Sequence, residues 1–162
     1  MKTKTFKKYF GLEYLTISGV PMVKTAAGYG VDAETMKSID EIVVKKIIAR
    51  RVPLRGKEVR FMRKALGLSS RALGEMLGLS HVAIQKWEKD EDKRLDLVNE
   101  IAVKAVLAAH LRLDVLIKDA VLRGIEKATK IEIQADEVGQ IAGARFNGPK
   151  MKSGRTLFRK EK

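Results

Sequence analysis

The sequence predicts a mainly α fold in which a helical unit follows a small β-hairpin and helix module. Residues 68–87, LSSRALGEMLGLSHVAIQKW, divide around Gly78 into two short stretches with apolar residues at helical spacing. Residues 32–51 and 95–118 show the same spacing over longer runs, whereas the first thirty residues hold β-prone runs. With 162 residues the chain fits one domain of ordinary size or two small ones. The expected division is 1–52, 53–120 and 121–162.

The first thirty residues predict a β-hairpin. Residues 14–17 and 22–25 are β-prone and flank residues 18–21, Ser-Gly-Val-Pro, which are typical of a turn. Residues 26–30 are expected to form a plain turn that leaves the hairpin. A phosphate-cradling loop is the alternative for their glycines, but the strand-glycine-helix context and a lysine partner are missing.

Two amphipathic helices are expected next. The first begins at Asp32 and runs to about Arg51, and Pro53 marks its end. Its apolar side consists of Met36, Ile39, Val43, Ile47 and Ile48, and its basic side includes Lys37, Lys45, Lys46 and Arg50. The second helix covers residues 54–66, with Val59, Phe61 or Met62, and Leu66 facing inward.

Residues 68–87 predict two helices joined by a tight turn. Ser69 and Ser80 can each cap a helix, because a serine oxygen accepts a hydrogen bond from an unpaired amide of the first turn. Gly78 stands where the chain must reverse, and glycine tolerates the left-handed conformation required there. Gly74 is expected where the two helices come closest. The inward set of the pair is Ala72, Leu73, Met76, Leu77, Leu79, Ala83, Ile84 and Trp87.

The second helix of this pair keeps a polar and basic outer side that suits the major groove of DNA. We expect His81, Val82 and Gln85 to read base edges, because valine can contact a thymine methyl group and glutamine is suited to adenine. The residues expected to hold phosphates are Ser70, Arg71, Ser80, Lys86 and Lys89. The alternative is a packed helical hairpin without a DNA role, since leucines at helical spacing more often form a core.

The same run resembles the helix-turn-helix of the Xre/Cro-repressor family. The matching positions are Leu68, Ser69, Leu73, Leu77, Gly78, Ser80, Ile84, Trp87 and Glu88. The chain departs from the family pattern at Ser70, Gly74 and Asp90. The resemblance implies a five-helix bundle, with residues 54–66 as its first helix, and sequence-specific DNA binding.

The region upstream is similar to the MqsA-like antitoxins of toxin–antitoxin operons. The matching positions are Tyr14, Gly19, Val20, Tyr29, Gly30, Leu54, Gly56, Glu58, Arg60, Phe61, Arg63, Lys64, Leu66 and Ser69. This resemblance implies a repressor that regulates its own operon and an N-terminal module that engages a toxin. Many relatives carry zinc-binding cysteine pairs in that module, and this chain has no cysteine. Two alternatives are a phage-type regulator without a toxin and a toxin-neutralising module with little DNA binding.

The segment after the pair is expected to begin with a charged, solvated connector at residues 88–94, followed by a helix over residues 95–118. Two apolar rows are expected on that helix. One holds Leu97, Ile101, Ala105, Ala108, Leu111 and Val115, and the other holds Val98, Ala102, Val106, Ala109, Leu113 and Leu116. Two adjacent rows can fill a core and also pair with a second copy, or they can form one wide core face. A homodimer fits the paired half-sites that such repressors bind.

Past residue 120 the sequence predicts a C-terminal extension. Residues 130–134 alternate polar and apolar side chains, which indicates a short strand. From residue 142 onward, glycine, proline and basic residues predict a flexible basic arm, and the last 18 residues hold seven basic groups and one acidic group. The arm could track phosphates, or it could be a solubilising tail.

Composition narrows the function classes. The chain carries 33 Lys+Arg against 20 Asp+Glu, a formal net charge of +13, which suits a polyanionic partner. Nucleophile–base pairs and metal-ligand motifs are not recognisable, so we expect no enzyme activity, no cofactor and no bound metal. The basic start lacks the apolar run of a signal peptide, and residues 101–117 are too charged to span a bilayer. A cytoplasmic protein is the expectation.

Overall fold

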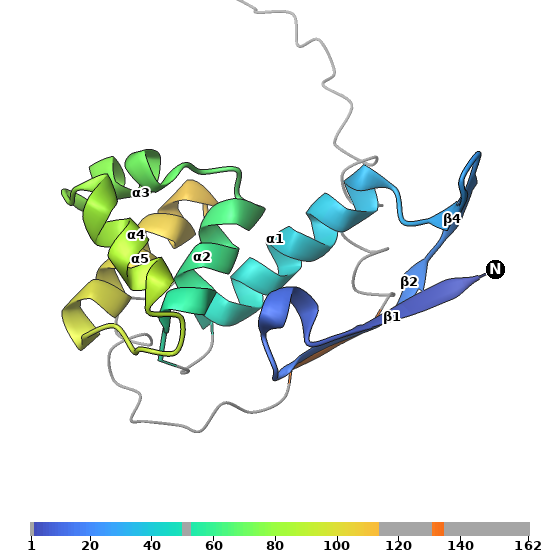
Figure 1. Ribbon diagram of the computed structural model, residues 1–162, viewed down its shortest axis with the longest axis horizontal. Coiled ribbons are helices and arrows are strands. Elements are labelled where there is room, and N and C mark those ends of the chain that lie inside the picture. The colour runs from blue at the N-terminus through green and yellow to red at the C-terminus, as the bar shows by residue number, and fades with distance from the viewer. Residues whose placement is uncertain (1, 50–52, 114–130, 135–162) are drawn as a thin grey trace, which may run out of the picture.

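The computed structural model describes residues 2–49, 53–113 and 131–134, which form helices at one end and a small strand module at the other (Figure 1). The described helices are α1 (Ala33–Ala49), α2 (Gly56–Ala65), α3 (Ser70–Leu77), α4 (His81–Lys89) and α5 (Leu97–His110). The mainly α prediction is therefore confirmed. The five-helix bundle stays a prediction, because α1 precedes Pro53 and residues 114–130 lie outside the described residues.

A three-stranded sheet and a separate hairpin make up the strand module. The sheet has the order β1-β2-β5 and consists of β1 (Thr3–Lys7), β2 (Leu15–Pro21) and β5 (Ile131–Gln134). β1 runs antiparallel to β2, and β5 runs parallel to it with Ile133 opposite Ile17. The hairpin consists of β3 (Val23–Thr25) and β4 (Gly28–Gly30) and projects beyond the sheet (Figure 1). The strand predicted near residues 130–134 is confirmed as β5.

The predicted turn at residues 18–21 is wrong, because these residues lie inside β2. Gly19 has φ +74 beside a register shift against β1, so the Ser-Gly pair forms a bulge instead of a turn. The chain reverses at Ala26 and Ala27, and the expected plain turn at residues 26–30 contains β4. The sequence also did not predict β1, whose polar side chains are mostly exposed.

One apolar cluster connects the sheet with the helices. Leu15, Ile17 and Ile133 of the sheet are fully buried, and α1 lies along this face of the sheet (Figure 1). The predicted apolar side of α1 is confirmed for Ile39, Val43, Ile47 and Ile48, while Met36 is half-buried. Leu73 of α3 and Ile84 of α4 belong to the same cluster, so the helix pair is supported by the α1 side of the fold.

Helix α5 differs from its prediction in length and in buried face. It ends at His110, where Arg112 has φ +53 and the amides of Leu111, Arg112 and Leu113 bond back to the last turn. Its buried residues are Glu100, Val103, Lys104, Leu107 and Ala108. Val103 and Leu107 belong to neither predicted row, because the core-facing side is rotated relative to both rows and includes a Lys104–Glu100 ion pair of 2.7 Å. Positions 115 and 116 of the rows lie outside the described residues.

Candidate nucleic-acid interface

Serine caps and a left-handed glycine define the α3–α4 pair. The Ser69 Oγ accepts a hydrogen bond from the Ala72 amide at 3.0 Å, and the Ser80 Oγ accepts one from the Ala83 amide at 3.2 Å. Gly78 has φ +68 at the end of α3, and the two helices pack closely. Both predicted caps and the turn glycine are confirmed. Because each bond joins groups three residues apart, the local sequence suffices to set the starts of both helices and the turn between them.

Gly74 marks a close approach, as predicted. A Cβ atom at this position would lie 2.7 Å from the carbonyl oxygen of Leu79 and 3.3 Å from the amide nitrogen of His81. The contact is therefore with the backbone of the corner and the start of α4. A side chain on residue 74 would push α4 away from α3.

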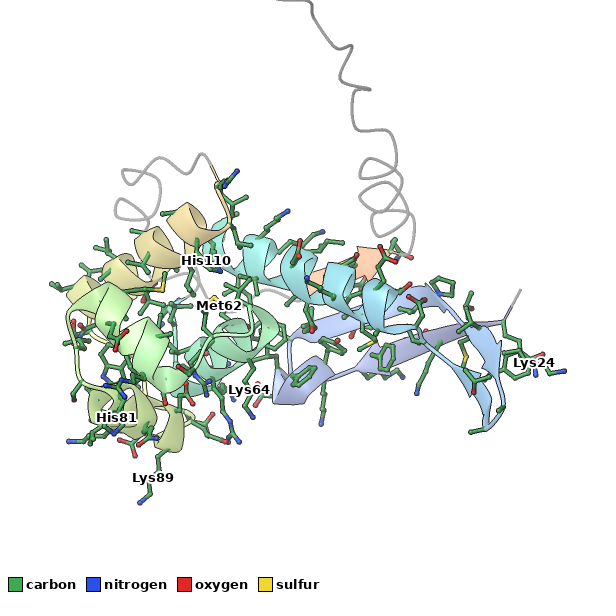
Figure 2. The ribbon with its side chains drawn as sticks, turned by 90° about the horizontal axis from the view of Figure 1, so that it is seen from above. Lys24, Met62, Lys64, His81, Lys89 and His110 are labelled. Atoms are coloured by element: carbon green, nitrogen blue, oxygen red, sulfur yellow. The ribbon has the colours of Figure 1, made fainter. Side chains whose placement is uncertain are left out.

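Helix α4 separates a buried side from an exposed side. Ile84 is fully buried, Trp87 is half-buried against the core, and Ala83 is half-buried. The side chains expected to face DNA are all exposed; they are His81, Val82, Gln85, Lys86 and Lys89. Figure 2 shows His81 and Lys89 on one side of the molecule and His110 on the opposite side. The structure brings together the three residues expected to read bases within the first five positions of one helix.

The other residues expected to hold phosphates lie at the starts of the two helices. Ser70 is half-buried in the first turn of α3, and Ser80 is exposed as the α4 cap. Arg71 forms an ion pair of 3.2 Å with Glu75. Both side chains are more than two-thirds exposed, so this pair is weak and can open to a phosphate. Met76, expected to point inward, is instead 39% exposed, because the core side of α3 is narrow and centred on Leu73.

A buried ion pair fixes α4 on α2. Arg63 donates to both carboxylate oxygens of Glu88, at 2.5 and 2.8 Å, and a further bond of 2.8 Å reaches the Leu68 carbonyl. Hydrogen bonding to Glu88 raises the pKa of the Arg63 guanidinium, which stays charged. The expectation that Glu88 belongs to a solvated connector is wrong, since its side chain is 10% exposed. The sequence carried one indication that Glu88 has a structural role, because Glu88 matches the Xre/Cro-repressor pattern.

The remainder of the connector is also packed against α2. The Lys57 amide donates to the Glu91 carbonyl at 3.0 Å, and the Gly56 amide donates to the Lys93 carbonyl at 3.2 Å. A Cβ on Gly56 would stand 1.9 Å from the Trp87 carbonyl oxygen, so only glycine permits this approach. Asp92 accepts a bond of 2.7 Å from Lys57. The backbone of this run therefore holds the end of α4 against α2, while the side chains of residues 89–94 stay exposed, so the solvated-connector prediction is wrong only for Glu88.

We also searched the described part of the chain for metal sites and for helices that could span a membrane. Within residues 2–49, 53–113 and 131–134, no group of three or more His, Cys, Asp or Glu side chains could hold a metal ion. Over the same ranges, no helix is both long and apolar enough to cross a membrane. The predicted basic arm from residue 142 onward lies outside the described residues.

Comparison with known proteins agrees with this geometry. Residues 59–102, from the middle of α2 into α5, match the sequence model of a helix-turn-helix family. The match supports an Xre-like helix-turn-helix regulator that binds DNA. Searches of curated proteins and of solved structures found no significant match.

Proposed function

We propose that this DNA-binding regulator is a dimeric repressor that places α4 in the major groove of operator DNA. The observation that carries the proposal is the exposed side of α4, where His81, Val82 and Gln85 stand on a helix held by a cap and a buried ion pair. A groove-reading helix must keep its position while its outer side chains stay free. α4 meets both requirements.

The side chains of α4 suggest how bases are read. Gln85 can form a bidentate contact with adenine, and Val82, 58% exposed, can contact a thymine methyl group. Lys86 and Lys89 follow on the same exposed side and would neutralise the flanking phosphates. The proposed site thus separates specificity at the start of α4 from electrostatic affinity at its end.

A homodimer is part of the proposal, because one recognition helix reads only a few base pairs. Leu97 and Val98, at the start of α5, are 60% and 75% exposed. Along the chain they come directly after Leu95 and Asp96, which together with Trp87 line part of a cleft of about 390 Å³. Large apolar side chains at such exposure are costly in water and suit a contact with a second copy.

An antitoxin role is the second part of the proposal, with autoregulation of the operon. It is supported by the resemblance of the region before Pro53 and by exposed apolar side chains on the β3–β4 hairpin, where Val23 and Tyr29 are 42% and 49% exposed. A protein partner could cover them. Co-purification with the product of the neighbouring reading frame tests this role. A complex that Val23→Asp disrupts supports it, and a frame whose product never co-purifies contradicts it.

The experiment for DNA binding is selection of duplexes from a randomised library, followed by mobility shifts on the selected and on a random duplex. We expect Gln85→Ala to cost about 1–3 kcal/mol on the selected duplex and little on the random one. The matched variant Lys89→Ala should weaken both duplexes alike. Equal losses for Gln85→Ala on both duplexes contradict base reading, and a wild-type protein without affinity for either contradicts the proposed function.

The dimer is tested by sedimentation. Val98→Asp should shift the protein to the monomer and weaken binding to a two-half-site duplex. Val23→Asp, an equal change at an exposed apolar side chain of the hairpin, should leave the dimer intact. A wild-type monomer at the concentrations that saturate DNA would exclude the proposed dimer.

A further inference from the structure

The loop between β1 and β2 is held in an unusual conformation against α2. It contains the short 3₁₀ turn η1 (Tyr9–Gly11), and Lys8 and Phe10 have φ +54 and +51 in the left-handed region. Non-glycine residues rarely adopt this region, and they keep it only where the surroundings enforce it. Such a backbone marks a loop whose placement matters.

Aromatic contacts and one hydrogen bond enforce this placement. The centroid of the Phe10 ring lies 5.5 Å from the centroid of the Phe61 ring of α2, and the centroid of the Tyr9 ring lies 6.2 Å from that of Phe61. The Tyr9 hydroxyl donates to Asp40 of α1 at 2.8 Å. Phe10 nevertheless remains 59% exposed, so its ring covers α2 only in part.

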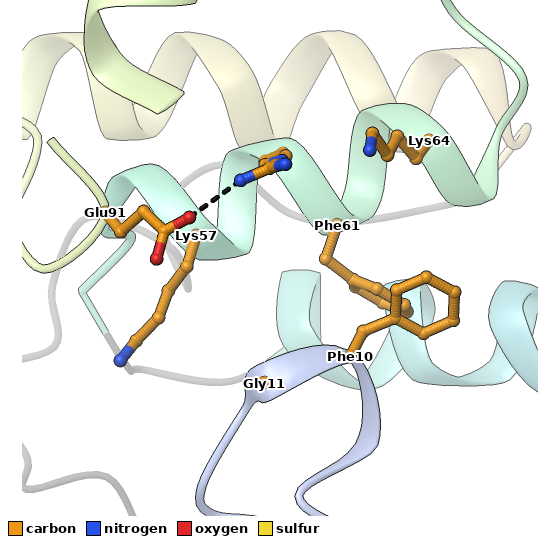
Figure 3. A pocket seen from close by; sticks show the side chains of 7 residues that line it. Phe10, Gly11, Lys57, Phe61, Lys64 and Glu91 are labelled. Carbon is orange, nitrogen blue, oxygen red and sulfur yellow. Dashed lines mark hydrogen bonds and ion pairs between the residues drawn. The ribbon is translucent and has the colours of Figure 1, made fainter. Parts of the chain in front are cut away.

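Between η1 and α2 lies a cleft of about 290 Å³ with a cationic lining (Figure 3). Its lining residues are Phe10, Gly11, Lys57, Arg60, Phe61, Lys64 and Glu91. Three of these side chains are positively charged and one is negatively charged, and Figure 3 shows them along one side of α2 next to the η1 turn.

The cations of this region differ in how firmly they are engaged. Lys57 is only 11% exposed and bonds Glu13 at 2.6 Å and Asp92 at 2.7 Å, so its charge serves the fold. Arg60 pairs with Glu91 at 2.7 Å, but both are about half exposed, and such pairs open at small cost. Lys8 and Lys64 are exposed and form no ion pair within the ranges that the structure describes.

One residue of the cleft lining lies on the side of the molecule that carries the exposed face of α4. Lys64 lies on the same side as His81 and Lys89 and opposite His110 (Figure 2), and α2 packs directly on α4. DNA bound to α4 therefore presents a phosphate strand to the residues beside α4. The DNA backbone carries one negative charge at each phosphate, and exposed lysines can contact these phosphates without reading the base sequence.

We propose that the η1–α2 cleft is a second DNA contact, in which Arg60 and Lys64 of the lining, together with Lys8 directly before η1, hold the phosphate backbone beside the groove occupied by α4. This inference rests on the proposed function. The strand module thereby extends the footprint of the helix-turn-helix, with Phe10 positioning Lys8. The exposed cations Lys8 and Lys64, which form no ion pair within the described residues, favour nucleic acid over a protein partner at this cleft.

The test is the salt dependence of binding to a selected and to a random duplex. Lys8→Gln combined with Lys64→Gln should lower the slope of log K against log[salt] by about 2, or roughly 0.9 per lost phosphate contact, on both duplexes. Glutamine keeps most of each side-chain stem, so the urea midpoint should not change. Lys24→Gln is the matched control, because Lys24 lies at the far end of the molecule from His81 (Figure 2). Its slope should equal that of the wild type.

A second variant tests the positioning. Phe10→Ala removes no charge but releases η1 from Phe61, and we expect its slope to fall by about 1 as Lys8 loses its place. Wild-type slopes for both the double variant and Phe10→Ala would overturn the second contact while leaving the proposed function intact. Loss of binding to a co-purifying protein, with unchanged DNA slopes, would also overturn it.

Discussion

The α3–α4 pair and the strand module differ in how far apart along the chain their stabilising contacts lie. In the pair, Ser69 and Ser80 cap their helices through amides three residues away. In the strand module, β2 pairs with β5, and Ser18 and Gln134, which share a hydrogen bond, are 116 positions apart. Local contacts set the ends of α3 and α4, and the Arg63–Glu88 pair ties α4 to the neighbouring helix α2, whereas the strand module depends on a distant segment to complete its sheet.

The largest expected effect tests how far the helix pair depends on its one buried ion pair with α2. Glu88→Ala leaves the Arg63 guanidinium, 13% exposed, without its partner, and we expect a loss of about 4 kcal/mol in the free energy of unfolding. Urea denaturation measures it. Glu75→Ala removes the carboxylate of the exposed Arg71 pair and should cost less than about 0.5 kcal/mol. Equal costs would show that the Arg63–Glu88 pair does not fix α4.

A smaller loss is expected where α2 meets the end of α4. Gly56→Ala places a methyl group 1.9 Å from the Trp87 carbonyl oxygen, which forces the backbones apart at a cost of about 3 kcal/mol. Thermal or urea unfolding measures the change. The matched change in the strand module, Gly30→Ala, meets only a Thr25 methyl group at 3.8 Å and should be nearly neutral. A neutral Gly56→Ala would contradict the close approach of α2 and α4.

The dependence of the sheet on its distant strand is tested by Ile133→Ala. Ile133 is a fully buried member of the core and pairs with Ile17 of β2, and the expected loss is about 2.5 kcal/mol because an edge strand relaxes in part around a cavity. Hydrogen exchange should show faster opening of β1 and β2 and little change in α3 and α4. If hydrogen exchange became faster to the same extent in both regions, the molecule would unfold as one unit. The strand module and the α3–α4 pair would then not differ in stability.

The smallest expected effect is a pH dependence at the contact between η1 and α1. Burial raises the pKa of Asp40 above its usual value of 3.8. Between pH 3.8 and the native pKa, the Asp40 carboxyl is therefore protonated in the native state and ionised in the unfolded state. Stability from this group is present below pH 3.8 and is lost as the pH rises through the native pKa. Asp40→Asn keeps an acceptor for the Tyr9 hydroxyl but cannot ionise. The free energy of unfolding of this variant should therefore rise relative to that of the wild type as the pH increases through the native pKa of Asp40.

Asp32→Asn provides the control of opposite sign. The hydrogen bonds from Thr35 at 2.6 and 2.8 Å lower the pKa of Asp32. Its contribution is therefore present above pH 3.8 and is lost as the pH falls through the native pKa. Chemical denaturation between pH 3 and pH 7 distinguishes the two curves. Parallel curves for both variants would contradict the assignment for Asp40.

Much of the proposed interface could be predicted because its determinants are local. Caps, a left-handed glycine and a helical apolar pattern fix α3 and α4, and the same pattern places His81, Val82 and Gln85 outside. Helical periodicity also located α1 and most of α5. The errors within helices concerned which side faces the core: Met76 is exposed and Val103 is buried because the direction of the core depends on neighbouring helices.

Tertiary structure decided the features that join distant segments. Whether Ser18 and Gly19 form a turn or a bulge depends on β1 and β5, which lie on either side of β2. Glu88 is either a solvated acid or a buried partner according to where Arg63 stands, 25 positions earlier. The sequence by itself determined α4 and its outer side chains, since capping bonds and an apolar pattern within one or two turns specify them. Only the packed fold brought η1 to α2, because that contact depends on the joint burial of groups far apart along the chain.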